Sequence, residues 1–232
     1  MRTINLLFIT FVSLALSGRG GPLPIQQTSN PLRRGASGFS EGEGTLESQQ
    51  SLLNSPTLIV NQAKIAVHSV FRLIREQVAV LNSLKDNLKS RRESRTKRDH
   101  PEVLNAVSTT VSNGKSMLQN ALRKVKMCKS LMKSVSKSAT NAKSKEPLNL
   151  DLVLQSNKVL LEAMAIDVDA VNLIVSELNE HKSGLYSRKQ QLAKVVADAP
   201  DRLVQSLSKL GSIVAKVSEI GSAIDRISGE RV

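Results

Sequence analysis

Apolar residues recur at alternating spacings of three and four in four long segments of the chain. This spacing places them on one side of an α-helix, so each segment is predicted to be an amphipathic helix. The helices are expected to begin at Ser55-Pro56, at His100-Pro101-Glu102, near Asn149 and at Pro200-Asp201. Three of these starts contain a proline, which is favoured in the first helical turn.

The residues at these spacings form what we call the apolar stripe of each segment. Its few non-apolar members are Gln77, Gly114, Asn157, Lys182, Lys189 and Gly221. In the third segment the stripe follows Leu154, Leu161, Val168 and Val175, weakens after Leu178 and extends to Val196. With two lysines in its stripe, the end of this segment is expected to hold a kink or a frayed end, near Gly184.

Further apolar residues flank the stripes, which indicates that each helix contacts two neighbours. The expected connections are short: residues 89–99, 143–148 and 197–199. Short connections favour antiparallel neighbours. The predicted fold class is therefore all-α, an antiparallel up-down bundle of four long helices, about 60 Å in length at about 1.5 Å per residue. An extended coiled coil that forms by self-association is the alternative.

Two segments precede the predicted bundle domain, which spans residues 55–232. Residues 1–18 begin with one arginine, continue as an uncharged apolar run and end in small residues, which predicts a secretory signal peptide. The run is too short to span a bilayer, and no later stretch is continuously apolar, so no transmembrane segment is expected after its removal. Residues 19–54 are rich in Gly, Pro, Ser and Gln and are predicted to be a disordered tail.

The predicted signal peptide indicates a secreted protein. A mitochondrial presequence is the less favoured alternative, because the first segment lacks an arginine-rich amphipathic pattern.

Cys128 is the only cysteine, so the bundle has to fold without an intrachain disulfide. It lies in the stripe between Val125 and Met132, where a free cysteine is expected to pack as a small apolar residue. An intermolecular disulfide is the functional alternative, since the predicted compartment is oxidising.

Charge is distributed unevenly along a chain whose formal net charge is +13. Residues 103–145 hold nine basic residues and no acidic residue, whereas residues 150–180 are mainly acidic. In an antiparallel pair the acidic segment would neutralise part of the basic one. The cations that point away from the stripe are candidates for anion binding, and we call them the basic face: Arg123, Lys126, Lys133 and Lys137. The simpler interpretation is a solvated surface that keeps the protein soluble.

Catalytic and cofactor motifs are not recognisable in the sequence, so we expect a protein that is not an enzyme and has no cofactor. His68, His100 and His181 lie on separate segments without metal-ligand spacing. The carboxylates Glu162, Asp167 and Asp169 are close in sequence, but without a partner histidine or phosphate loop they are expected to form a solvated helix face.

A basic cluster in the connection before His100 matches the pattern that dibasic processing proteases cleave: Arg95, Lys97 and Arg98. A weaker candidate is Arg33-Arg34. The sequence thus favours a secreted, non-enzymatic helical protein that acts by recognising the surface of a protein partner. One alternative is a binder of acidic polymers or anionic lipid surfaces through the basic face. The other is a precursor that is cleaved at the dibasic connection.

Overall fold

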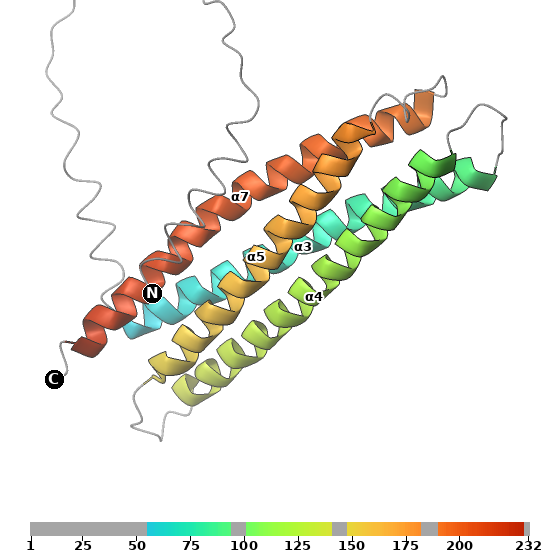
Figure 1. Ribbon diagram of the computed structural model, residues 1–232. Helices are drawn as coiled ribbons and strands as arrows, with labels where there is room; N and C mark the ends of the chain where they lie inside the picture. The colour runs from blue at the N-terminus through green and yellow to red at the C-terminus, as the bar shows by residue number, and fades with distance from the viewer. Residues whose placement is uncertain (1–54, 94–100, 141–147, 182–189, 230–232) are drawn as a thin grey trace, which may run out of the picture.

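The computed structural model describes residues 55–93, 101–140, 148–181 and 190–229. They form four helices: α3 (Pro56–Glu93), α4 (Pro101–Thr140), α5 (Leu150–Glu180) and α7 (Gln190–Gly229). Successive helices run in opposite directions (Figure 1). The prediction of an all-α, antiparallel four-helix bundle is therefore confirmed. The predicted signal peptide and tail, residues 1–54, lie outside the described residues.

The helices are arranged as a ring around one apolar core. α4 packs between α3 and α5, and α7 packs between α5 and α3 on the other side. α3 and α5 also touch across the centre. The wide apolar faces predicted two neighbours for each helix, and this arrangement supplies them. Among the helices described, none is long and apolar enough to cross a membrane.

The core is made of side chains from the predicted stripes and the residues that flank them. The largest fully buried apolar side chains are Ile59, Ile74, Leu81, Leu84, Leu118, Leu160, Met164, Ile174, Leu178, Leu203 and Leu210. Each such side chain contributes about 1.5–3 kcal/mol when it is transferred from water. Apolar burial on this scale lets the bundle fold without a disulfide.

Three helices begin at the residues predicted from the sequence. The amide of Ile59 donates to the carbonyl of Ser55 at 3.1 Å, with Pro56 as the first residue of α3. α4 begins at Pro101. Asn149 is the N-cap of α5, because its side-chain Oδ1 accepts from the amide of Leu152 at 3.1 Å.

The predicted boundary between the last two helices is wrong. α5 ends at Glu180 and α7 begins at Gln190, so Pro200 lies inside α7 rather than at its start. A proline in a helix interior lacks one backbone hydrogen bond and costs about 3 kcal/mol in an exposed helix. Here Ala199, Pro200 and Leu203 are buried, and their packing offsets that cost. The predicted kink near Gly184 falls in residues 182–189, outside the described residues.

The buried face of α5 agrees in part with its predicted stripe. The stripe residues that are buried are Leu150, Asn157, Met164, Val168, Val171 and Leu178. Leu154, Leu161 and Val175 are only half-buried. The residues one position earlier are buried, among them Leu160 and Ile174. Because α5 contacts α3 across the centre as well as α4 and α7, its buried face is wider than a two-neighbour stripe.

Candidate functional site

The basic face lies on the outward side of α4. Arg123, Lys126, Lys133 and Lys137 are all exposed. They follow one another at spacings of three, seven and four, which keeps them on one helix surface over about 21 Å. Their exposure agrees with the predicted orientation, whereas their binding to anions stays a prediction.

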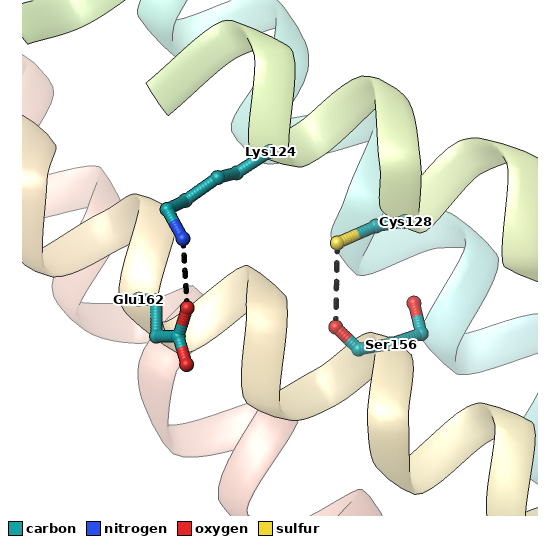
Figure 2. Close-up of polar contacts among 4 residues, drawn as sticks. All are labelled: Lys124, Cys128, Ser156 and Glu162. Carbon is teal, nitrogen blue, oxygen red and sulfur yellow. Dashed lines mark hydrogen bonds and ion pairs between the residues drawn. The ribbon is translucent and has the colours of Figure 1, made fainter. Parts of the chain in front are cut away.

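Two cations at the edges of α4 instead contact the neighbouring helices of the bundle. The ammonium of Lys124 donates to Oε2 of Glu162 on α5 at 2.8 Å (Figure 2). This hydrogen bond and the positive charge of Lys124 lower the pKa of the Glu162 carboxyl below its usual range. On the opposite edge, Nζ of Lys129 lies 3.4 Å from the centre of the Phe71 ring on α3, a cation–π contact. Lys124 and Lys129 therefore bind neighbouring helices, and the outward cations face solvent.

One large apolar side chain interrupts the basic surface. Met127 is 58% exposed and lies one residue after Lys126 on the outer side of α4. Methionine is flexible and polarisable, and it is frequent at surfaces that bind other proteins. The outer side of α4 thus combines positive charge with an apolar contact point.

Cys128 is fully buried between α4 and α5, as its stripe position predicted. Its Sγ donates to the backbone carbonyl of Ser156 at 3.3 Å (Figure 2). Burial raises the pKa of the thiol to about 11, although the hydrogen bond opposes part of that rise. The alternative role in an intermolecular disulfide stays a prediction.

The expectation that Asp167 lies on a solvated face is wrong. Its side chain is 0% exposed, in contrast to Glu162 and Asp169, which are exposed as predicted. Burial raises the pKa of the Asp167 carboxyl to about 7, and the neighbouring amide of Gln77 partly opposes the increase. Neither carboxyl oxygen has a hydrogen-bond partner among the described residues.

Asp167 belongs to a set of buried polar side chains from three helices, which we call the polar layer: Gln77 on α3, Asp167 on α5 and Ser206 on α7. Nε2 of Gln77 donates to Oγ of Ser206 at 3.0 Å, whereas its Oε1 has no partner within the described helices. The sequence signalled Gln77, as a polar residue in an apolar stripe, but it gave no signal that Ser206 is the hydrogen-bond partner of Gln77 or that Asp167 is buried.

A cavity of about 160 Å³ between α3 and α7 reaches this layer. Gln77 and Ser206 are its buried polar lining. Its remaining lining residues are Leu73, Glu76, Val80, Arg202, Leu203, Gln205 and Lys209.

Of the histidine candidates, the structure describes two, which lie apart from each other. His68 is exposed, and His181 is the C-cap of α5, with Nε2 3.2 Å from Oε1 of Glu177. That carboxylate neighbour, four residues earlier, was overlooked in the sequence. No group of three or more His, Cys, Asp or Glu side chains that could hold a metal occurs in the described parts of the chain. His100 and the processing candidates Arg95, Lys97 and Arg98 lie outside the described residues.

Comparison with known proteins gives no relative from which a function could be transferred. No protein-family model matches the chain, and no curated protein or solved structure shows significant similarity to it.

Proposed function

We propose that this chain is a secreted, non-enzymatic protein that recognises an acidic surface of a protein partner through the outward side of α4. The observation that carries the proposal is the row of exposed cations Arg123, Lys126 and Lys133 on a helix with no acidic residue after its first turn. A row of like charges raises the local concentration of oppositely charged groups and increases the rate at which acidic partners associate.

The arrangement of the bundle supports this assignment of the contact surface. α4 packs against α3 and α5 along its inner side, so its outer side is covered by neither neighbour. On α5, Glu162 pairs with the cation at the edge, Lys124, rather than with an outward one. Lys137 is exposed on the same face and has an interaction of its own within the chain, so the proposal does not depend on it.

Met127 favours a protein partner over an acidic polymer. A sulfated or phosphorylated polymer offers mainly charge, whereas protein interfaces bury apolar side chains such as methionine together with arginine. An anionic lipid surface also offers apolar contact and remains the alternative for the same residues. The proposal of export depends on the N-terminal sequence pattern alone.

The test measures the binding of poly-L-glutamate, as a probe of acidic polypeptide, at low and physiological salt. The full chain is compared with a variant carrying Arg123→Gln, Lys126→Gln and Lys133→Gln. We expect binding that weakens with salt in the parent protein and is lost in the variant, with an unchanged helical circular dichroism signal. Binding that survives the triple substitution, or no binding at low salt, would contradict the proposal.

A matched control removes the same charge elsewhere. Lys85→Gln, Lys216→Gln and Arg226→Gln replace three exposed cations on α3 and α7 and lower the net charge equally. This variant should bind like the parent protein, because the effect is expected to be local rather than to follow net charge.

Heparin and phosphatidylserine vesicles, measured in parallel, separate the alternatives. A clear preference for heparin over poly-L-glutamate would favour an acidic polymer over a protein partner, and a clear preference for the vesicles would favour a lipid surface.

A further inference from the structure

Three helices bring polar side chains together at the polar layer, in the middle of an apolar core. Gln77 connects the layer, because its amide donates to Ser206 and also lies against Asp167. Asp167 is fully buried, and its two oxygens lack hydrogen-bond partners among the described residues. An ionised carboxylate in this position would have lost its hydration without gaining the donors that normally replace it.

The charged groups on the surrounding helices do not compensate for this loss. Asp167 lies on α5 between Ala170, which is close to Gly114 on α4, and Glu162, which binds Lys124 on α4. The stretch of α4 that runs alongside Asp167 therefore extends from Gly114 to Lys124. Its charged residues are Lys115, Arg123 and Lys124. On α3 and α7 the charged groups that line the cavity beside the layer are Glu76, Arg202 and Lys209. Desolvation raises the pKa of Asp167, the Gln77 amide partly opposes this rise, and no charged group contributes.

The cavity between α3 and α7 gives solvent a path to the layer. It is lined by Gln77 and Ser206, and the exposed side chains of Arg202 and Lys209 also line it. A separation of α3 from α7 would widen this cavity and hydrate the layer. Such local opening is the low-energy route by which a buried carboxyl exchanges its proton with solvent.

We propose that the polar layer is a proton-controlled latch: Asp167 carries a proton when α3, α5 and α7 are fully packed, and loss of that proton favours local separation of α3 and α7. The inference is independent of the proposed recognition surface, since the layer and the basic face share no residue.

The sign of the pH effect follows from the two states. In the packed bundle the pKa of Asp167 is about 7, whereas in an opened, hydrated layer it returns towards its ordinary value of 3.8. Between these values the opened form has released the proton and the packed form has kept it. The equilibrium constant for opening therefore rises about tenfold per pH unit over this range and levels off above pH 7.

Hydrogen exchange of the full chain tests the latch. Protection of the α3 and α7 amides around Gln77 and Ser206, corrected for intrinsic exchange, is measured at pH 5 and pH 7. We expect opening to increase about fiftyfold in the parent protein between these two values, since the effect begins to level off at pH 7. In Asp167→Asn, which has the same shape and no titration, the change should fall below about threefold. The matched control, Asp169→Asn, alters an exposed carboxyl two residues away and should behave like the parent protein.

A direct titration keeps the test valid if Asp167→Asn packs poorly. Carbon NMR of the Asp167 carboxyl in the parent protein should show a midpoint well above that of Asp169. A midpoint near 4 would overturn the proposal, as would equal pH dependence of exchange in the parent protein and a folded Asp167→Asn variant.

Discussion

The thiol of Cys128 on α4 donates a hydrogen bond to the backbone carbonyl of Ser156 on α5, at 3.3 Å (Figure 2). The side chain is fully buried, so the thiol joins two helices and has no surface towards solvent. Burial also raises its pKa to about 11, and only the thiolate is strongly nucleophilic. At pH 8 this pKa leaves about one molecule in a thousand as thiolate.

We therefore predict that Cys128 reacts with a thiol reagent such as dithionitrobenzoate only when the bundle opens. At pH 8 without denaturant, labelling should be slow and should have the rate of global or local opening. In guanidinium chloride, one thiol per chain should react at once. Rapid labelling of the native protein, or a dimer on a gel that disappears with reductant, would favour the intermolecular disulfide instead.

Gly114 allows α4 and α5 to pack closely, and its replacement should be costly. A Cβ at this position would collide with Cδ1 of the buried Ile174 and lie 2.6 Å from its Cγ1. Gly114→Ala gains about 1 kcal/mol in helix propensity. Overpacking of a tight core costs about 1–3 kcal/mol, so the net effect expected in urea unfolding is a loss of stability.

Two comparisons separate overpacking from propensity. Gly221→Ala on α7 meets nothing within 4 Å of the added Cβ, so it should stabilise the protein by about 0.5–1 kcal/mol. Combining Gly114→Ala with Ile174→Val removes the colliding Cδ1 and should recover part of the loss. An equal gain from both glycine substitutions would mean that Ile174 moves aside at little cost.

The fold could be predicted from the sequence because nearly every stripe residue of α3 and α4 is apolar, the exceptions being Gln77 and Gly114. In α4, the stripe residues Val125, Cys128 and Met132 are all buried, as their spacing requires. The outward orientation of Arg123 and Lys126 follows from the same spacing, so the candidate surface could be located before its structure was known. Local signals failed at Pro200, because the preference of proline for a first turn is weaker than the burial of this part of α7, where Ala199, Pro200 and Leu203 all lie in the core.

The polar layer could not be predicted from one helix at a time. Asp167 lies three residues after Met164 and four before Val171, so it has stripe spacing, but a carboxylate is ordinarily assigned to solvent. Its burial results from contacts of α5 with helices on three sides, which depend on how distant segments assemble. Gln77 was the single visible sign, and its partner Ser206 is 129 residues away.

The ion pair between Lys124 and Glu162 should contribute little to stability. Both side chains are partly exposed, at 30% and 49%, so solvent screens their attraction. Glu162→Gln is expected to cost less than about 1 kcal/mol. Because the pKa of Glu162 is lowered in the folded state, its contribution is present above the ordinary value of 4.5 and is lost as the pH falls through the folded value.

The measurement is the difference in urea unfolding free energy between the parent protein and Glu162→Gln at pH 7 and pH 3. The difference should shrink at the lower pH and also in 1 M salt, which screens exposed pairs. Glu180→Gln is a suitable control, because it removes another exposed carboxylate of the same helix. A loss well above 1 kcal/mol would show that the pair orders the contact between α4 and α5.

Asn157 is a second buried polar residue on α5. Its side chain is 4% exposed, and neither its amide nitrogen nor its oxygen has a hydrogen-bond partner among the described residues. Leaving such a group unsatisfied costs about 1–3 kcal/mol. Asn157→Leu replaces the amide with an apolar group of similar shape, so unfolding in urea should show a gain of that order, with an unchanged denaturant slope. Asn120→Leu, an exposed substitution of the same type on α4, should change stability by less than about 0.5 kcal/mol. A loss of stability in Asn157→Leu, or a change in oligomeric state, would instead assign Asn157 a role in fixing how the helices pair, as buried polar residues do in coiled coils.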